Sequence, residues 1–397
     1  MDDSWREDEL EGPAVNAAAA PDEVRRGGGP PYTGAVPIRN QAAERDMSMT
    51  RREFGRVAIA GLPALGVAWR GSAALPAQAS ANPSTWGGVR VGLNVPYSLG
   101  LGNNLAAEEV LKQLVDLGIG SVELRAQPVE NFLGSPTVRA AAEAEKARAA
   151  ARAAGQPAPT PQQMAQGGLG GNRTPTPEQA AAADARKKEV RAWRLAASSA
   201  KVKDLRKMYE KAGVIVDVLK VDDLYTVSNE ELDYFFQMAR DLGARAISSE
   251  LPQQRADTKR IGAFADKHKI FAAYHHHAQG TVALYEEIFT EAKYNGANID
   301  IGHWMATHDE SVLPFIATHH DRIPHIHVKD RQSKTNGGQN KPFGEGDTPV
   351  RQTLQAIRDN KWNVRPIIEF EYRVPEGSTR AAEIRKCLDY CQAALQA

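Results

Sequence analysis

The sequence has little cysteine, no excess of charge of either sign and no apolar run long enough for a membrane span. Its 397 residues include two cysteines, which excludes a disulfide framework and a cysteine-based zinc cluster. The 49 basic and 49 acidic residues cancel, which argues against a nucleic-acid partner, because such proteins usually present a basic face. The mild apolar run 57–69 is too short to span a bilayer, so no stable membrane anchor is expected.

The first part of the chain has the features of a protein-sorting signal. Residues 1–46 are rich in Ala, Gly, Pro and charge without an apolar period, which predicts a disordered extension. Residues 47–81 combine Arg51-Arg52, the apolar run and small residues before a cleavage position, as twin-arginine export signals do. We therefore expect the twin-arginine export machinery as a partner and a periplasmic or other extracytoplasmic location. A disordered basic segment is the alternative.

The position of this signal raises a question about the start of translation. Signal peptides begin close to their charged region, yet here 50 residues precede the paired arginines. Met47 and Met49 lie just before them. We expect translation to start at one of these two methionines, which would leave residues 1–46 untranslated.

From residue 82 onward, short β-branched runs alternate with amphipathic helical stretches. This alternation predicts parallel strands joined by right-handed crossovers, and eight such units predict an α/β fold that closes as a (β/α)8 TIM barrel over residues 82–397. The predicted strands are 89–95, 121–125, 214–221, 244–250, 270–276, 297–302, 323–328 and 366–372. An open doubly wound sheet is the rival, but no G-x-G-x-x-G follows the first strand.

One segment interrupts this alternation. Residues 134–190 are dominated by Ala, Pro, Gly and Gln, which predicts a low-complexity insertion after the second strand, helical at its Ala-rich flanks and disordered at its centre. The insertion follows a strand on the face where barrel active sites form. It is interpreted either as a tolerated surface loop or as a lid.

All ten histidines lie between His268 and His327. Side chains at the carboxyl ends of barrel strands converge on one mouth. The predicted strands end with acids and histidines: Glu250, His275, His277, Asp300, His327 and Glu369, with Glu371 as the alternative to Glu369 on one strand face. Buried carboxylates and imidazoles need compensation, which one divalent metal ion provides. Mixed histidine and carboxylate ligands suit Mn, Co, Zn or Fe. The alternative is that each histidine is a separate core or helix-end residue.

Several stretches in this region resemble a known superfamily. They are AYHHH at 273–277, DIGH at 300–303, HIHVKD at 325–330, FGEGD at 343–347 and IIEFE at 367–371. In this order they are similar to the xylose-isomerase-like TIM barrels, the sugar phosphate isomerase/epimerase family, which also include inosose dehydratases and endonuclease IV. The YHHH run with the following Gly-Thr is most similar to inosose dehydratases.

The resemblance implies a metal held by residues of strands 5 to 8. Asp300, His327 and Glu369 match the ligand positions, whereas His275 stands where epimerases have a glutamate. Glu250, one strand earlier, is expected to supply the missing carboxylate as a fifth ligand. This departure puts the two-glutamate proton transfer of the epimerases in doubt.

The expected reaction starts from a hydroxy-ketone or keto-sugar chelated by the metal. Glu250, His277 or Lys329 is expected to act as the base that gives an enediolate, and return of the proton then isomerises or epimerises the sugar. Glu123, Lys220 and His303 are expected to bind substrate. Structural ion pairs are the alternative for Glu123 and Lys220, and His303 could instead be a metal ligand or orient one.

Three other functions are weighed against this one. A dehydratase or lyase of a keto-sugar or keto-inositol would use the same site. A non-catalytic carbohydrate-binding barrel would have a degraded metal site. A phosphoesterase of the endonuclease IV type would need extra histidines on strands 2 and 3, whose ends carry Arg125 and Lys220.

Overall fold

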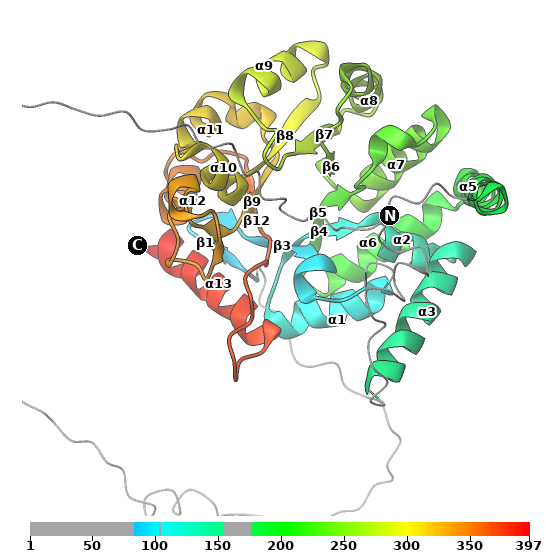
Figure 1. Cartoon of the computed structure of the whole chain (residues 1–397), viewed down its shortest axis with the longest axis horizontal. Helices are drawn as coiled ribbons and strands as arrows, with labels where there is room; N and C mark the ends of the chain where they lie inside the picture. The colour runs from blue at the N-terminus through cyan, green and yellow to red at the C-terminus, as the bar shows by residue number, and fades with distance from the viewer. Residues whose placement is uncertain (1–82, 103–104, 154–175) are drawn as a thin grey trace, which may run out of the picture. The chain divides into compact units, whose positions relative to one another are not determined.

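The computed structural model describes residues 83–102, 105–153 and 176–397, and the fold is described for these (Figure 1). The expected extension 1–46 and export signal 47–81 lie outside the described residues. Eight parallel strands form a closed barrel in the order β12-β3-β4-β5-β6-β7-β8-β9. The predicted (β/α)8 TIM barrel is therefore confirmed. The barrel strands are β3 (Gly92–Val95), β4 (Ser121–Arg125), β5 (Ile215–Lys220), β6 (Ala246–Glu250), β7 (Phe271–His275), β8 (Asn295–Asp300), β9 (His325–Val328) and β12 (Arg365–Ile368).

Helices surround the barrel, and Figure 1 shows the strands at the centre of this ring. The α-helices are α1 (Ala107–Leu117), α2 (Ala126–Leu133), α3 (Pro136–Ala153), α5 (Pro177–Ala196), α6 (Ser199–Lys211), α7 (Asn229–Leu242), α8 (Arg255–His268), α9 (Val282–Glu291), α10 (Ile301–His308), α11 (Leu313–His319), α12 (Val350–Asp359) and α13 (Arg380–Gln396). Short 3₁₀ turns are η1 (Tyr97–Leu99), η2 (Leu224–Thr226), η3 (His320–Arg322) and η4 (Lys334–Asn336). Two small hairpins pair β1 (Thr85–Trp86) with β2 (Val89–Arg90), and β10 (Asp330–Arg331) with β11 (Asn340–Lys341).

Local sequence signals explain several helix ends. Gly118 and Gly243 end α1 and α7 with positive φ values of 73° and 80°, the left-handed conformation that glycine adopts without a Cβ clash. Ser228 and Glu231 form a capping box at the start of α7. These signals make the turns that return the chain to the next strand.

Only the predicted strand 121–125 has the same bounds in the structure, and three of the other differences matter for the site. The first divides, because β2 pairs with β1 in a hairpin and only β3 joins the barrel. The sixth ends at Asp300, whose side chain caps α10. The eighth ends at Ile368, so Glu369 and Glu371 lie in the loop beyond β12. The prediction that these two glutamates share a strand face is therefore wrong.

The inserted segment between β4 and β5 begins and ends with helices. Its Ala-rich flanks are α3 and α5, while the centre at 154–175 lies outside the described residues. Arg194 of α5 forms ion pairs with Glu130 of α2 at 2.7 Å and with Glu231 of α7 at 2.9 Å. These bonds fix the end of α5 on the outer ring of helices.

In the described ranges, no helix has the length and apolarity that crossing a membrane would require.

The barrel interior is unusually polar. Barrels are commonly filled by layers of branched aliphatic side chains, and here an apolar layer between strands and helices forms the main core. Inside the barrel the buried residues include Asn94, Glu123, Ser248, Asn298 and His325. This polar interior lies directly beneath the strand ends that carry the candidate site.

Candidate metal centre and active site

The strand register brings four ligand-type side chains together at the carboxyl ends of β7 to β12. Asp300 of β8 pairs with His327 of β9, and β9 in turn pairs with β12 just before Glu369. His275 ends the neighbouring strand β7. One potential ligand atom from each of His275, Asp300, His327 and Glu369 lies within 4.8 Å of the others, and all four residues are buried. We call this group the four-residue cluster.

Asp300 is held in place by its second role as a helix cap. Its Oδ1 accepts a hydrogen bond of 2.8 Å from the backbone N–H of His303, which satisfies one free donor of α10. This bond accounts for the three-residue spacing of Asp300 and His303, and it leaves Oδ2 facing the cluster. Gly302 between them has no side chain because an added Cβ would lie 2.3 Å from Cγ of Lys329.

His327 is oriented by an acid beneath it. Its Nε2 lies 2.5 Å from Oε2 of Glu123, and both side chains are fully buried. Its Nδ1 lies 3.3 Å from Oε2 of Glu369. Burial would lower the pKa of His327, but Glu369 and Glu123 outweigh it and raise that pKa to about 10. A carboxylate behind an imidazole is the usual support of a metal-binding histidine, because it fixes the tautomer and the ring.

Glu123 therefore lies too deep in the barrel to contact a substrate. We predicted that it binds substrate hydroxyls, but its side chain is inaccessible and bonded to His327. Burial would raise the pKa of Glu123, yet His327 and His325 hold it at about 2. The carboxylate stays ionised beneath the cluster, and the physical reason for the correction is its depth in the barrel.

Lys329 extends into the middle of the acids. Its Nζ lies 2.7 Å from Glu369, 2.6 Å from Glu371 and 3.0 Å from Asp300. Burial would lower the pKa of Lys329, but these three carboxylates raise it well above its ordinary value. The group stays an ammonium, so its surroundings favour a hydrogen-bond donor and not the base we predicted.

The cluster fits the predicted divalent cation. Nδ1 of His275 is buried and has no hydrogen-bond partner among the described residues, while Nδ1 of His327 lies beside the carboxylates of Glu369 and Asp300. His327 and the ionised Glu123 form one pair, and three further carboxylates face the ammonium of Lys329, which leaves two negative charges to be balanced. Two imidazoles with carboxylates form the donor set that Mn, Co, Fe and Zn accept.

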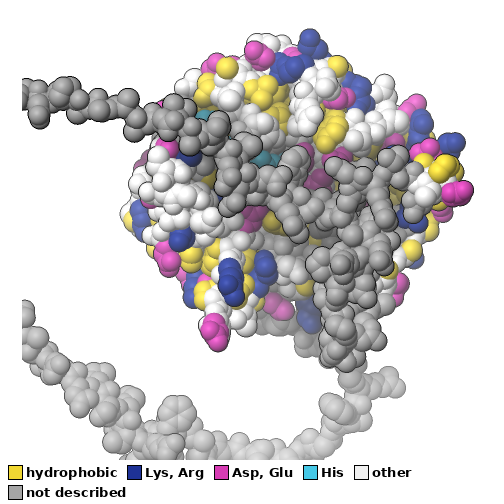
Figure 2. Space-filling view, in the orientation of Figure 1, with side chains coloured by type: hydrophobic (Ala, Val, Ile, Leu, Met, Phe, Trp, Pro, Cys, Tyr) yellow, Lys and Arg dark blue, Asp and Glu magenta, His cyan; other side chains and the backbone are white. Residues whose placement is uncertain are grey.

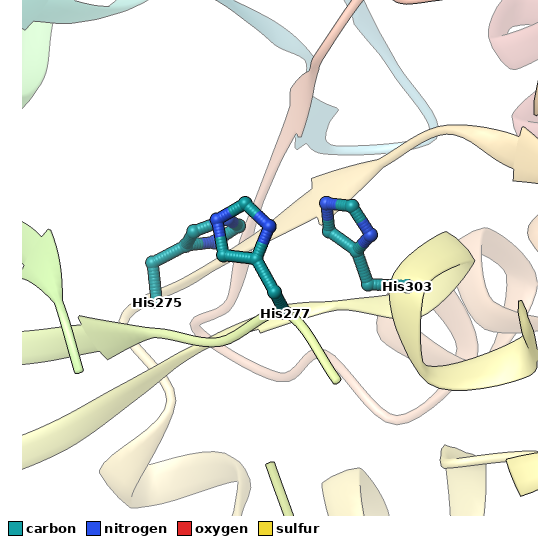
Figure 3. A group of neighbouring side chains, drawn as sticks. All are labelled: His275, His277 and His303. Carbon is teal, nitrogen blue, oxygen red and sulfur yellow. The ribbon is translucent and has the colours of Figure 1, made fainter. Parts of the chain in front are cut away.

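Three histidine rings approach one another beside the cluster. His275 ends β7, His277 follows it, and His303 lies in α10, and Figure 3 shows their rings gathered over one space. The ring centroids of His277 and His303 are 4.7 Å apart. Each of the three also offers a nitrogen within 4.8 Å of the others. His276 points away as predicted: it is buried against Trp304, and its Nε2 accepts from the backbone N–H of Asp300.

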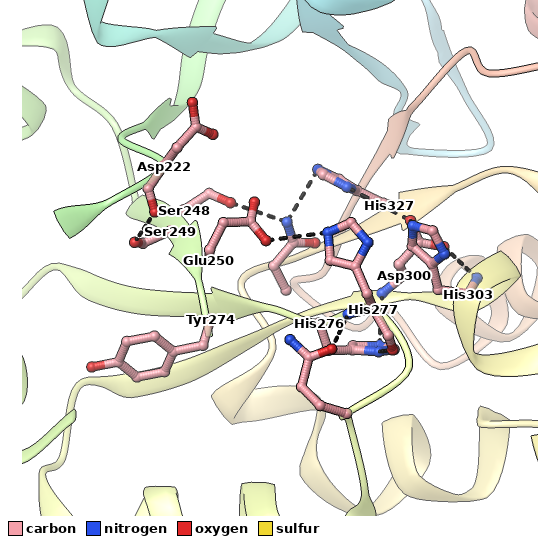
Figure 4. A network of polar contacts seen from close by, with 12 residues as sticks. Asp222, Ser248, Ser249, Glu250, Tyr274, His276, His277, Asp300, His303 and His327 are labelled. Atoms are coloured by element: carbon pink, nitrogen blue, oxygen red, sulfur yellow. Dashed lines mark hydrogen bonds and ion pairs between the residues drawn. The ribbon is translucent and has the colours of Figure 1, made fainter. Parts of the chain in front are cut away.

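Glu250 and His277 form a separate pair at the rim (Figure 4). Nε2 of His277 lies 3.3 Å from Oε2 of Glu250, and the His277 side chain is 51% exposed. The other carboxylate oxygen, Oε1, accepts from Lys220 at 2.7 Å. Burial would raise the pKa of Glu250, but Lys220 and His277 lower it to about 2. The hydrogen bond to Glu250 in turn raises the pKa of His277.

This pairing changes two predicted roles. The structure does not bring Glu250 into the four-residue cluster, because its two oxygens are already bonded to Lys220 and His277. Lys220, expected to contact substrate, is almost fully buried and forms an ion pair. At the ends of β4 and β5, where a further metal of the endonuclease IV type would need histidines, stand the cations Arg125 and Lys220, each paired with an acid.

Three residues at the site were missed in the sequence. Asn94 donates to Oε1 of Glu369 at 2.8 Å, Tyr97 donates to Oε1 of Glu371 at 2.9 Å, and Arg331 lies 2.7 Å from Nδ1 of His303. Asn94 stands near the end of the first barrel strand, so the strand-end rule could have found it. Tyr97 and Arg331 lie beyond the barrel strands, in η1 and β10, where no periodic signal points to them.

The aspartate of HIHVKD organises the loop that follows. Both oxygens of Asp330 accept backbone N–H groups, from Gly344 at 2.7 Å, Gly346 at 3.1 Å and Thr348 at 3.2 Å. An added Cβ at Gly346 would lie 2.2 Å from Asp330 Oδ1, so glycine is required there. The FGEGD stretch is thus fastened to the strand end that carries His327 and Lys329.

The outer surface agrees with the balanced charge of the chain. On the face seen in Figure 2, histidine is visible near the middle of the molecule, and basic and acidic side chains are intermixed around it.

Comparison with known proteins places this geometry in a family. The family described as xylose isomerase-like TIM barrel matches residues 111–393. No protein with a curated description matches the sequence. Among solved structures, an uncharacterised protein from Parabacteroides distasonis is 20% identical, with 77% of this chain and 98% of that one covered and a TM-score of 0.46.

Two further structures are similar at lower identity. A xylose isomerase domain protein from Alicyclobacillus acidocaldarius is 14% identical over 78% of this chain and 99% of its own, with a TM-score of 0.49. A D-psicose 3-epimerase with D-fructose is 12% identical over 78% of this chain and 100% of its own, with a TM-score of 0.49. These similarities say nothing about chemistry, and the assignment depends on the family match across most of the barrel. The chain belongs to the xylose isomerase-like TIM barrel family.

Proposed function

We propose that this protein is a metal-dependent enzyme that isomerises or epimerises a hydroxy-ketone or keto-sugar. The observation that carries the proposal is the four-residue cluster of His275, Asp300, His327 and Glu369, buried at the barrel mouth with ligand atoms within 4.8 Å of one another. A divalent cation bound there supplies Lewis-acid polarisation of neighbouring sugar oxygens, which makes the adjacent C–H more acidic.

The proton transfer is assigned to His277, supported by Glu250. His277 is half exposed beside the cluster, so its ring can reach a substrate, and its hydrogen bond to Glu250 fixes its orientation. Removal of a proton next to the carbonyl gives an enediolate, and its return to a different carbon or face completes the reaction. Lys329 donates to the oxygen that gains negative charge, because its ammonium is already held among acids at the mouth.

His303 is assigned to binding a substrate hydroxyl. Nη1 of Arg331 lies 2.7 Å from Nδ1 of His303 and Nζ of Lys329 lies 3.1 Å from its Nε2, so two cationic donors face a ring that accepts at only one nitrogen when neutral. Its Nε2 also lies 3.8 Å from Oδ2 of Asp300. A substrate hydroxyl that replaces one of the two cations as a partner of the ring would form the proposed hydrogen bond to His303.

Exchange of substrate protons with solvent tests the proposal. The protein is loaded with Mn, Co, Zn or Fe and incubated in deuterated water with 2-keto- and 3-keto-sugars, with and without a chelator. We expect deuterium next to the carbonyl, measured by NMR, with metal only. His277→Gln should slow exchange about 100-fold, while His319→Gln, a histidine remote from the cluster, should leave it unchanged.

The products of the same assay decide between related functions. Loss of a β-oxygen would give a dehydrated product and would make the protein a dehydratase or lyase on the same site. Sugar binding without exchange, by a chain that holds no metal, would leave only a carbohydrate-binding barrel. Exchange that persists in metal-free protein would contradict the proposed metal dependence.

Export is a separate proposal that depends on residues 47–81 alone. Fusion of this segment to a reporter, compared with an Arg51→Lys, Arg52→Lys version, tests the twin-arginine route. Equal export of both would contradict it.

A further inference from the structure

A cavity opens beside the four-residue cluster. It has a volume of about 460 Å³ and is lined by Tyr97, Leu101, Phe370, Glu371 and Arg380 together with two glycines. Glu371 is the shared wall: its Oε2 contacts Lys329 at 2.6 Å on the cluster side, and its Oε1 accepts from Tyr97 at 2.9 Å on the cavity side. The cavity is therefore placed to receive a part of the substrate that extends away from the reacting carbons.

Arg380 is the cation of this cavity, and it is held in a fixed position. Its guanidinium lies 4.9 Å from the ring centroid of Phe370, and its Nη1 donates to the backbone carbonyl of Ser98 at 3.3 Å. A Cβ added at Gly100 would lie 2.6 Å from its Nε, so the glycine leaves the space that the side chain uses. An arginine stacked on an aromatic ring loses little freedom when its remaining N–H groups bind a ligand.

Arg380 also lacks an acidic partner in the part of the chain that the structure describes. The nearest acid of the cavity, Glu371, is bonded to Lys329 and Tyr97. With a divalent cation in the cluster, three positive charges including Lys329 balance the carboxylates of Asp300, Glu369 and Glu371. Among the described residues, Arg380 is then a positive charge of this cavity that no acid compensates.

We propose that the cavity binds an anionic group, a carboxylate or a phosphate, that the substrate carries away from its reacting carbons. This rests on the proposed function and narrows its substrate class to sugar acids or sugar phosphates. The planar guanidinium matches the paired oxygens of either anion. The volume lies within the range of small-molecule sites, and Tyr97 and Leu101 line it beside the two charged groups of Glu371 and Arg380.

Calorimetric titration of the metal-loaded protein tests the subsite without relying on turnover. The probes are D-glucuronate, D-galacturonate and D-glucose 6-phosphate, each compared with its neutral parent sugar. At least one anionic probe should bind roughly tenfold more tightly than its parent, with the preference reduced by added salt. Equal affinity for every acid and its parent would overturn the proposal.

Variants locate the preference. Arg380→Gln should abolish the preference for the anion and leave the Kd of the neutral sugar within about twofold, while Arg380→Lys should retain part of it because a point charge replaces the fork. Arg385→Gln is the matched control, since Arg385 lies on the same helix but donates to the carbonyl of Asp116 outside the cavity. An anion preference that survives in a folded Arg380→Gln variant, with an unchanged melting temperature, would also overturn the assignment.

The subsite and the proposed reaction can fail independently. If anionic probes bind through Arg380 but no keto-sugar exchanges deuterium, the subsite stands and the proposed reaction fails. If neutral and acidic keto-sugars exchange at equal rates in wild type and in Arg380→Gln, the reaction stands and the subsite fails.

Discussion

The two halves of the barrel mouth use the same kinds of residue to different effect. In the half formed by β4 to β6, Arg125 pairs with Asp222, and Lys220 contacts both Glu250 at 2.7 Å and Asp222 at 3.6 Å. Two cations thus meet two acids. In the half formed by β7 to β12, the one ammonium of Lys329 faces three carboxylates.

The difference shows where a cation is needed. Ionised acids in a poorly solvated site are costly unless their charge is balanced. The β4 to β6 half is balanced by its own side chains, so it is a rigid wall. The β7 to β12 half is unbalanced, and among the described residues it contains a buried imidazole nitrogen without a hydrogen-bond partner, Nδ1 of His275. Charge balance, and not residue type, separates the candidate metal centre from its neighbour.

The largest expected effect comes from removing one acid of the unbalanced half. Asp300→Asn keeps an oxygen that caps α10 but removes the charge, so metal content should fall from one ion per chain toward zero. Activity should fall roughly 10³-fold, because several kcal/mol of charge stabilisation are lost. Elemental analysis and the deuterium-exchange rate measure the two effects. Asp222→Asn is the matched change in the balanced half, and this variant should bind as much metal as the wild-type protein. Full metal content in Asp300→Asn would contradict the proposed difference between the two halves.

Removal of the metal by a chelator should destabilise the wild-type protein but not a variant that has lost an acid of the β7 to β12 half. An ion held at 100 times its Kd stabilises the folded state by about 2.7 kcal/mol, so treatment with a chelator should lower the melting temperature of the wild-type protein by several degrees. Asp300→Asn should already melt at the lower temperature and show no further change. Scanning calorimetry with and without added Mn or Zn measures this. If the chelator does not change the melting temperature of the wild-type protein, no metal ion stabilises the four-residue cluster and the proposed metal centre is contradicted.

The fold followed from local patterns, whereas the division of the mouth did not. Alternation of strands and helices predicted the barrel, and the strand-end rule placed Asp300, His275 and His327 at one mouth. The rule failed to predict the role of a side chain where its hydrogen-bond and ion-pair partners decide that role. Glu123 of β4 turned inward to His327 of β9, a residue far away in the sequence, and both oxygens of Glu250 were taken by Lys220 of the neighbouring strand β5 and by His277. A single sequence carries the position of a strand end but not the balance of charges around it.

A smaller effect is expected from the support beneath the cluster. Glu123→Gln removes the negative charge that orients His327 and leaves the four-residue cluster intact. Loss of such a supporting carboxylate typically weakens metal binding 10- to 100-fold, so about that increase in the metal Kd is expected. Activity should recover when excess metal is added, which separates this residue from a ligand. Competition titration with a chromophoric chelator gives the Kd; a value equal to that of wild type would show that Glu123 only fills the barrel.

The smallest effect on metal binding is expected from Glu250→Gln, in the balanced half. Lys220 is almost fully buried, and the change removes its nearest acid while Asp222 remains at 3.6 Å. Unfolding free energy should fall by about 2 kcal/mol, less than for a pair that loses its sole partner. The metal Kd should match that of the wild-type protein, because neither oxygen of Glu250 belongs to the four-residue cluster. Urea denaturation and chelator competition measure the two quantities. A metal Kd raised tenfold or more with unchanged stability would restore Glu250 as the fifth ligand that the sequence predicted, and the two halves of the mouth would then share one metal.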